Sequence, residues 1–243
     1  MTMKIFSENK NCNCCSNKVF EEIFKINNMP LRTANNFSNK NIKNHKKISL
    51  TFLFCKKCKN MQLKENVNPQ ILYNNFSYKT SSSLGLVKHF NLLAKKKFKD
   101  LNIKKDDLII DIGSNDGSFL EYFKKKGAKV LGIEPSKKIS LVANRKGIKT
   151  LCKYFNKKSS MEIKKEYGNA RLISCFNTFA NIENIQNFLI GFKNIMSHKT
   201  VGIIETQYGL DVIKKSLIDT IYHEHINYFT KKSLNILFQK NGL

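Results

Sequence analysis

The clearest indication of the fold is the stretch Leu108-Ile109-Ile110-Asp111-Ile112-Gly113-Ser114-Asn115-Asp116-Gly117. The apolar run over 108–112 predicts a short buried strand, and a helix is expected directly after the loop, over 118–126. The loop has the pattern Asp-x-Gly-x-x-x-Gly, which differs from the Gly-x-Gly-x-x-Gly of dinucleotide-binding folds. Because glycine lets a backbone turn sharply and approach a ligand closely, the stretch predicts a strand, a ligand-binding loop and a helix in succession.

Further strands and helices alternate on the carboxyl-terminal side of this stretch. Strands are expected over 130–133, 148–152, 171–176 and 201–205, and helices over 137–146, 185–196 and 231–240. Such alternation is typical of a parallel sheet wrapped by helices, so we expect an α/β, Rossmann-like domain over 106–243. Residues 66–105 indicate a helical connector, and residues 1–65 lack helical periodicity and indicate a separate module rich in cysteine.

A carboxylate follows the second strand of this domain. Glu134 lies 21 residues after Gly113, where it can accept hydrogen bonds from both ribose hydroxyls of a nucleoside. Ligands of such sheets bind at the carboxyl ends of the strands, an edge that also holds Asn177 after the fourth strand. The loop and the carboxylate together favour a binding site for S-adenosylmethionine. The alternative is a glycine turn beside an ordinary surface glutamate that binds no ligand. The expected cofactor-binding residues are Asp111, Gly113, Ser114, Asn115, Asp116, Gly117, Glu134 and Asn177.

Four of the cysteines form two Cys-x-x-Cys pairs, Cys12 with Cys15 and Cys55 with Cys58. Two such pairs can place four thiolates tetrahedrally around Zn²⁺, and the second pair follows an apolar strand over 50–54. A closed four-thiolate site has no open coordination position, so the expected zinc is structural and not catalytic. Free buried thiols or a redox pair are the alternatives, and Cys14 could replace a neighbouring ligand.

The chain is strongly basic, with 43 lysine and arginine residues against 18 acidic ones and a net charge of +25. Nucleic-acid binding is one interpretation. The lysines, however, are scattered in twos and threes. Arginine, whose guanidinium group forms paired hydrogen bonds with bases and phosphates, is scarce. We therefore expect a small anionic substrate and not a nucleic acid. Without an apolar run of ~20 residues or an apolar segment at the amino terminus, we expect a cytoplasmic protein with no membrane partner.

Seven motifs occur in an order that matches one known family. They are Cys12-x-x-Cys15, Pro30-Leu31, Cys55-x-x-Cys58, Tyr78-Lys79-Thr80-Ser81-Ser82-Ser83, the loop Asp111 to Ser118, Gly132-Ile133-Glu134-Pro135 and Ile221-Tyr222-His223-Glu224-His225. The chain resembles the zinc-containing sugar C-methyltransferases, which methylate C-3 of nucleotide-linked 4-keto deoxysugars. The resemblance covers essentially the whole chain, and Tyr-His-Glu-His together with Gly-Ser-Asn-Asp-Gly is quite specific to that family.

The resemblance implies an S-adenosylmethionine-dependent enzyme that removes a proton next to a ketone and transfers a methyl group to carbon, normally on a dTDP-linked sugar. It implies that His225 is the general base, that Tyr222 and Glu224 position the base or the enolate, and that Tyr78 belongs to the substrate pocket. An imidazole with an ordinary pKa of about 6.5 suits such proton removal at neutral pH. Without the family, the two histidines of His223-Glu224-His225 would more often be packing or surface residues.

The chain departs from this family in two places. Asn181 stands where family members commonly have histidine after Asn-x-Phe-Ala. Family members also carry a further C-terminal domain of similar size, so we expect a missing domain or a partner chain. A non-catalytic or partner-dependent protein that binds zinc and cofactor is therefore one alternative. A nucleic-acid methyltransferase is another, although Asn177-Thr178-Phe179-Ala180 lacks the Pro-Pro-aromatic pattern of the amino-methylating enzymes.

Overall fold

The computed structural model describes residues 4–31, 46–73 and 76–243. The chain divides into two compact units. The cysteine unit comprises residues up to 75 together with 179–186 and 206–243, and the parallel-sheet unit comprises 76–178 and 187–205. The sequence places residues 206–243 in the cofactor domain, whereas their contacts group them with the cysteine-containing residues. The reason is that this segment supplies a strand to the sheet of the cysteine unit.

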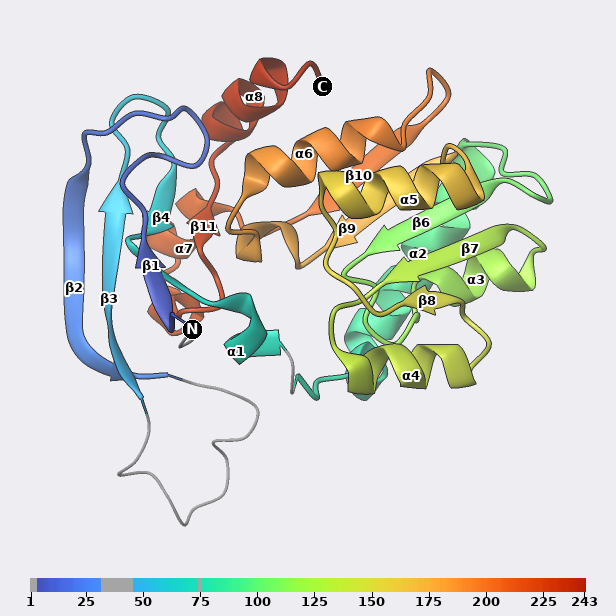
Figure 1. The fold of residues 1–243 in the computed structure, drawn as a ribbon, viewed down its shortest axis with the longest axis horizontal. Coiled ribbons are helices and arrows are strands. Elements are labelled where there is room, and N and C mark those ends of the chain that lie inside the picture. The colour runs from blue at the N-terminus through green and yellow to red at the C-terminus, as the bar shows by residue number, and fades with distance from the viewer. Residues whose placement is uncertain (1–3, 32–45, 74–75) are drawn as a thin grey trace, which may run out of the picture. The chain divides into compact units, whose positions relative to one another are not determined.

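A five-stranded parallel sheet forms the centre of the parallel-sheet unit, in the order β10-β9-β6-β7-β8 (Figure 1). Its strands are β6 (Leu108–Ile112), β7 (Lys129–Ile133), β8 (Thr150–Leu151), β9 (Leu172–Phe176) and β10 (Val201–Glu205). All neighbouring strands run parallel, and Asp111 of β6 lies opposite Gly132 of β7 and Ser174 of β9. The predicted Rossmann-like sheet is confirmed, and β6, which carries the ligand loop, is its middle strand.

Helices connect the strands, as the alternating pattern predicts. They are α2 (Leu84–Asp100), α3 (Leu120–Lys125), α4 (Lys137–Arg145), α5 (Lys157–Tyr167) and α6 (Ile185–Asn194), with a short 3₁₀ helix, η2, at Thr80–Ser82. The sequence does not predict α5, because only Ser159, Ser160 and Ile163 of this lysine-rich segment are buried. The helix begins with a capping box, in which Asn156 and Ser159 each accept a hydrogen bond from the backbone N–H of the other.

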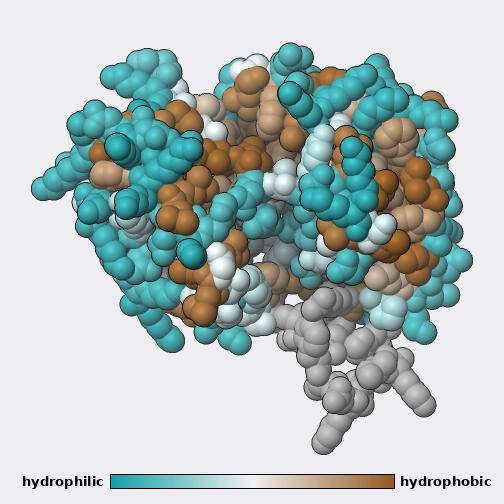
Figure 2. All heavy atoms as spheres, turned by 180° about the vertical axis from the view of Figure 1, so that it is seen from behind, coloured by the Kyte–Doolittle hydropathy of each residue, from teal (hydrophilic) through white to brown (hydrophobic). Residues whose placement is uncertain are grey.

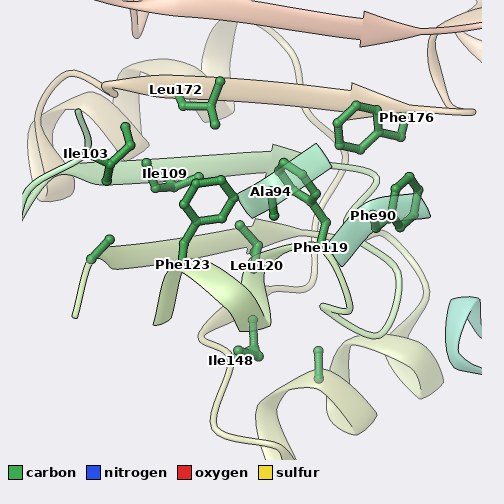
Figure 3. Packing of buried hydrophobic residues seen from close by; sticks show 12 residues of the cluster. Phe90, Ala94, Ile103, Ile109, Phe119, Leu120, Phe123, Ile148, Leu172 and Phe176 are labelled. Atoms are coloured by element: carbon green, nitrogen blue, oxygen red, sulfur yellow. The ribbon is translucent and has the colours of Figure 1, made fainter. Parts of the chain in front are cut away.

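The core of the parallel-sheet unit packs α2 and α3 against β6 and β9 (Figure 3). Phe90 of α2, Phe119 and Phe176 gather there, and the ring centres of Phe119 and Phe176 are 4.7 Å apart in an edge-to-face arrangement. Aromatic pairs of this kind stabilise by ~0.5–1.5 kcal/mol beyond the burial of their surface. Because Phe176 ends β9 and Phe119 precedes α3, the cluster fixes the carboxyl edge of the sheet next to the ligand loop.

The cysteine unit is built on an antiparallel sheet in the order β11-β4-β3-β2. Its strands are β2 (Glu21–Pro30), β3 (Lys47–Phe54), β4 (Met61–Leu63) and β11 (Asn227–Tyr228), and a separate pair joins β1 (Phe6–Glu8) to β5 (Glu65–Val67). Its helices are α1 (Pro69–Tyr73), α7 (Gly209–Lys214) and α8 (Lys231–Lys240), with 3₁₀ helices η3 (Phe179–Asn181) and η4 (Ile218–Thr220). Phe52, Leu63 and Tyr228 form the core together with Val212 of α7.

The sequence does not predict β2 or β11. Most positions of β2 are exposed and its register shifts twice, so its residues show no regular alternation of apolar and polar positions. β11 has only two residues and is defined by its pairing with β4, which is distant in the sequence. Of the helical connector expected over 66–105, residues 69–73 and 84–100 are helical, and Asn74 and Asn75 lie outside the described residues.

No helix within the three described ranges is long and apolar enough to cross a membrane. Hydrophilic residues cover much of the face drawn in Figure 2, with hydrophobic residues between them. This distribution agrees with a chain in which lysine is frequent and scattered.

Candidate cofactor, metal and acid–base sites

The loop after β6 turns sharply into the next helix. Gly113 and Gly117 have φ angles of 73° and 77°, in the left-handed region that favours glycine, and Asn115 between them has a φ angle of 49°. The backbone N–H groups of Gly113 and Ser114 both donate to the carbonyl of Ile133, at 2.8 and 3.2 Å. These bonds fix the predicted ligand loop against the carboxyl end of β7.

Gly113 is required for steric reasons. A Cβ atom at this position would overlap Oγ1 of Thr178, would lie 2.8 Å from its Cβ, and would strain the φ angle. We expect Gly113→Ala to lower the free energy of unfolding by on the order of 3 kcal/mol. Because the loop must shift, we also expect S-adenosylhomocysteine to bind at least about ten-fold more weakly, as measured by calorimetry.

Gly168 provides the matched control for this prediction. It has a φ angle of 83°, but nothing lies within 4 Å of a Cβ atom built on it. Gly168→Ala therefore introduces the backbone strain without the overlap and leaves the loop untouched. If both alanine variants lost the same stability and bound S-adenosylhomocysteine equally well, the steric account of Gly113 would be wrong.

Glu134 follows β7 and is buried, with an exposed fraction of 6%. One carboxylate oxygen accepts a hydrogen bond from the backbone N–H of Asn115 at 3.1 Å, and the other accepts one from Ser136 at 2.8 Å. Burial raises the pKa of this carboxyl above its ordinary value, against the lowering effect of these two N–H groups. Each carboxylate oxygen has two lone pairs, so each keeps one for a hydroxyl group. The site therefore fits the ribose of S-adenosylmethionine.

The side chains of Asn115 and Asp116 bond within the protein. Asn115 accepts a hydrogen bond from the backbone N–H of Thr80 at 2.9 Å and donates one to the carbonyl of Tyr78 at 2.9 Å. Asp116 is buried and pairs with Lys146 at 3.0 Å. These two expected cofactor residues thus tie the loop to the segment before α2 and to the end of α4. Sequence reasoning did not identify Lys146, because nothing local links it to the loop.

Asp111 lies at the end of β6 and is 3% exposed. Its carboxylate accepts a hydrogen bond from Oγ of Ser174 at 2.7 Å. Burial raises the pKa of this carboxyl to about 7, while the bond from Ser174 lowers it and the charge of Glu134 raises it further. Asp111 therefore changes its charge near neutral pH, directly before the ligand loop.

We expect Asp111 to make the stability of the parallel-sheet unit depend on pH. Its folded-state pKa of about 7 lies above the ordinary 3.8, so its contribution to stability is complete below about pH 4 and is lost as the pH rises through about 7. The loss is on the order of 4 kcal/mol. Asp111→Asn keeps an acceptor for Ser174 without the charge. Denaturant unfolding should therefore show the free energy of unfolding of the variant rising relative to that of the wild type between about pH 4 and pH 7. A difference that does not change with pH would contradict this account.

Further polar groups lie at the carboxyl edge of the sheet. Asn177 follows β9, is exposed, has a φ angle of 51° and donates its backbone N–H to the carbonyl of Glu205 at 2.9 Å. Glu205 ends β10, and its carboxylate lies 2.7 Å from Nε2 of His89 on α2. No local pattern in the sequence links His89 to Glu205, and sequence reasoning missed the pair. Ser114 is buried, and its Oγ has no hydrogen-bond partner among the described residues.

The four cysteines of the two Cys-x-x-Cys pairs come together in the cysteine unit. Their sulfur atoms all lie within 4.8 Å of one another, with Cys12 and Cys58 3.4 Å apart and Cys15 and Cys55 3.6 Å apart. Four thiolates around one tetrahedral Zn²⁺, each at about 2.3 Å, would be ~3.8 Å from one another. The cluster therefore has the size of a zinc site, and the buried Cys14 is not part of it.

The two cysteine pairs are held by equivalent backbone turns. The N–H of Ser16 donates to the carbonyl of Cys12, and the N–H of Lys59 donates to the carbonyl of Cys55, both at 2.8 Å. Ser16 and Lys59 have similar positive φ angles, 62° and 65°. The N–H groups of Cys12 and Cys55 in turn donate to Asn17 at 2.7 Å and Asn60 at 2.9 Å. Two turns of like geometry thus present their thiols to one centre, as a structural metal site requires.

Tyr222 and His225, two of the expected catalytic residues, lie together in the cysteine unit. The hydroxyl of Tyr222 is 3.0 Å from Nε2 of His225. Nδ1 of His225 is 2.9 Å from the carbonyl of Thr220 and 3.0 Å from the amide of Gln207. Burial lowers the pKa of His225 below its ordinary value, against the raising effect of the Thr220 carbonyl. The imidazole is therefore neutral at pH 7, as a general base must be.

The contacts of His225 define its tautomer. A carbonyl oxygen only accepts, so Nδ1 carries the proton and donates it to Thr220, while Nε2 keeps a lone pair that accepts from Tyr222. Oε1 of Gln207 is a buried acceptor without a hydrogen-bond partner, and a half-turn of the amide brings it to Nδ1–H. Nε2 is therefore the basic atom. Sequence reasoning missed Gln207 and Thr220, because no motif links them to the histidine.

The other expected substrate and catalytic residues have different surroundings. Glu224 lines, together with Tyr222 and Phe24 of β2, a cleft of about 300 Å³ in the cysteine unit. His223 is buried, its Nε2 lies 3.4 Å from the carbonyl of Ser49, and burial lowers its pKa. Tyr78 is exposed and belongs to the parallel-sheet unit. The structure brings the hydroxyl of Tyr222 into hydrogen-bond distance of His225.

Comparison with known proteins matches the chain to a sequence family, to a curated relative and to solved structures. The sequence family described as a methyltransferase domain matches residues 87–243. The C-methyltransferase NovU of Streptomyces niveus is 30% identical over 194 residues, which cover 80% of this chain and 46% of NovU. The chain thus spans about half the length of this curated relative.

Solved structures match the fold at low sequence identity. An S-adenosylmethionine-dependent methyltransferase from Archaeoglobus fulgidus has a TM-score of 0.50 at 17% identity, over 63% of this chain and 68% of that chain. The plantazolicin methyltransferase BamL, solved with S-adenosylhomocysteine and a triazolic analogue, has a TM-score of 0.50 at 14% identity, over 64% of this chain and 60% of that chain. NovU confirms the resemblance to C-methyltransferases that the motifs indicate. The chain therefore belongs to the methyltransferase-domain family and has the fold of the S-adenosylmethionine-dependent methyltransferases.

Proposed function

We propose that this protein transfers a methyl group from S-adenosylmethionine to the carbon next to the ketone of a nucleotide-linked keto deoxysugar, normally a dTDP-linked one. The observation that carries the proposal is the contact of Tyr222 with His225, whose neutral imidazole keeps a basic Nε2. The resemblance of the motifs to sugar C-methyltransferases and the identity to the C-methyltransferase NovU support it.

Methylation of such a carbon depends first on a base. The carbon becomes nucleophilic when it loses its proton, and an imidazole that titrates near neutrality suits that step. His225 would take the proton at Nε2, while its Nδ1–H stays bonded to the carbonyl of Thr220 and stabilises the imidazolium. The hydroxyl of Tyr222, released from Nε2 by the incoming proton, would then donate to the enolate oxygen. S-adenosylmethionine, when bound, supplies an electrophilic methyl group whose transfer needs in-line placement against the carbon.

The remaining site residues would bind the cofactor, the methyl acceptor and the zinc ion. The Gly113 loop would approach the cofactor closely, and Glu134 would accept hydrogen bonds from its ribose hydroxyls. Glu224 and Tyr78 would contact the acceptor. Cys12, Cys15, Cys55 and Cys58 would hold a structural Zn²⁺ that takes no part in the chemistry.

A direct assay tests the proposal. The zinc-loaded protein is incubated with S-adenosylmethionine and a dTDP-linked 4-keto deoxysugar, and the masses of the products are measured. We expect a sugar nucleotide heavier by one methylene, with S-adenosylhomocysteine formed in equal amount. In heavy water without S-adenosylmethionine, the hydrogen next to the ketone should exchange for deuterium. A folded protein that binds S-adenosylhomocysteine but shows neither methylation nor exchange would contradict the proposal.

A further inference from the structure

A groove of about 620 Å³ lies in the cysteine unit, and its lining includes Lys59, which follows Cys58 of the metal cluster. The start of β2 and the end of β3 contribute to it, as do α7 and the first residues of α8. Its volume falls within the ~300–1,000 Å³ typical of small-molecule sites. Among the described residues that line it there is no cysteine of the metal cluster, nor Tyr222 or His225. The groove therefore has no ligand assigned to it so far.

The lining of the groove is apolar and accessible to solvent. Ile23, Leu210 and Ile213 line it with exposed fractions of 47%, 40% and 50%. Phe54 and Tyr208 add two planar side chains to the same lining. Soluble proteins expose a group of large apolar side chains chiefly where a ligand or partner covers it. The occupant of this groove must therefore have apolar surface of its own.

The rim of the groove is basic. Lys59, Lys231 and Lys232 line it, and Nζ of Lys59 lies 5.5 Å from the centre of the Phe54 ring in the same lining. Glu21 is the one carboxylate among the described lining residues, and it pairs with Lys56 at 3.0 Å. The positive charge at the rim is therefore not cancelled from within the groove, and an occupant with negative charge is favoured.

The start of α8 adds to this preference for an anion. Lys231 and Lys232 are the first two residues of this helix of 10 residues. Its capping box satisfies the backbone N–H groups of Thr230 and Ser233. The first backbone N–H groups of a helix have no intrahelical partner, and the helix dipole places positive potential there. Lys231 and Lys232 thus bring two ammonium groups and the start of a helix to the lining of the apolar groove, a combination that favours phosphate.

We propose that this groove binds the nucleoside diphosphate part of the methyl acceptor. The base would lie against the apolar lining beside Phe54 and Tyr208, and the diphosphate would lie at Lys231, Lys232 and the start of α8. A wholly apolar ligand would leave the lysines unused, and an inorganic anion would leave the apolar side chains uncovered. The identity of the nucleotide rests on the proposed function, whereas the required chemistry, a planar apolar group joined to phosphates, follows from the groove itself.

Calorimetric titration of the zinc-loaded chain of 243 residues with dTDP tests this inference. We expect binding to one site, weakened at least about ten-fold by the double variant Lys231→Ala/Lys232→Ala. The matched control is Lys157→Ala/Lys158→Ala. These two lysines are likewise the first two residues of a helix, α5, which has the same kind of capping box with serine at its third position. Neither lysine lines the groove. The control variant should bind dTDP like the wild type.

The failure of this inference can be distinguished from the failure of the proposed function. No dTDP binding by a chain that holds zinc and binds S-adenosylhomocysteine would overturn the groove assignment. Equal affinities of the two double variants would overturn it as well. If methylation of a dTDP-linked sugar is found, the Lys231→Ala/Lys232→Ala variant should raise KM for that sugar with little change in kcat. An unchanged KM would contradict the groove assignment but would not contradict the proposed methyl transfer. Loss of dTDP binding in this variant alone would support the groove even in a chain without activity.

Discussion

Replacing Cys58 by serine is expected to abolish the proposed zinc binding and to unfold the cysteine unit. Cys58 lies 3.4 Å from Cys12 and belongs to a cluster of four thiols within 4.8 Å of one another. Binding of structural Zn²⁺ to such sites contributes on the order of 10 kcal/mol to folding, more than the whole stability of many domains. Without the metal, no coordination bonds would hold together the three remaining thiols, which belong to Cys12, Cys15 and Cys55. Metal content by mass spectrometry and circular dichroism on heating would measure both effects.

Two further cysteines provide matched controls for the zinc prediction. Cys152 is exposed and lies in the parallel-sheet unit, so Cys152→Ser should keep one zinc per chain and the full stability. Cys14 is buried beside the cluster but does not belong to it, so Cys14→Ser should also keep the zinc. A wild-type protein without zinc, or a Cys58→Ser variant that retains zinc and stability, would contradict the metal assignment.

Replacing His225 by glutamine is expected to lower the rate of methyl transfer by a factor of about 10²–10⁴, the range for loss of a general base. Glutamine can keep a polar group near Thr220 and Gln207, but it cannot take up a proton at neutral pH. Binding of S-adenosylhomocysteine should remain unchanged, because the ligand loop belongs to the other unit. The deuterium exchange of the sugar substrate should fall with the methylation rate, since both depend on removal of the same proton.

His223→Gln is the control for this variant, because it changes a histidine of the same segment that bonds to the carbonyl of Ser49. We expect it to affect stability more than the rate. The wild-type rate should rise with pH until His225 is fully neutral, and the midpoint should lie below the ordinary pKa of histidine, since burial lowers the pKa of His225. A His225→Gln variant that exchanges and methylates at the wild-type rate would show that another group is the base.

Local patterns in the sequence predict the central features of the fold and of the candidate cofactor site. The apolar run before Gly113 predicts β6, because burial on both faces of a parallel strand requires a continuous apolar segment. The positive φ angles of Gly113 and Gly117 agree with the turn that the glycine spacing predicts. The convergence of Cys12, Cys15, Cys55 and Cys58 was likewise predictable, because the metal sets the spacing of its ligands.

Contacts between distant segments could not be predicted in this way. Gln207 and Thr220 reach His225 from a loop and a 3₁₀ helix, and neither has a periodicity or motif that links it to the histidine. The same holds for β11, whose two residues join the sheet of the cysteine unit through β4. No local pattern in the sequence predicts the groove beside α7, because its apolar side chains come from four separate segments.

The Gly113 loop and Glu134 are expected to hold S-adenosylmethionine. The most direct test of this binding is calorimetric titration of the folded, zinc-loaded chain with S-adenosylhomocysteine, compared with the Glu134→Ala variant. Each hydrogen bond to a charged group contributes ~1.5–3 kcal/mol, so the loss of the carboxylate should weaken binding at least ten-fold. The account predicts one-to-one binding by the wild type and binding by Glu134→Ala that is weaker by at least that factor. A folded wild-type chain that does not bind, or equal binding by both proteins, would contradict it.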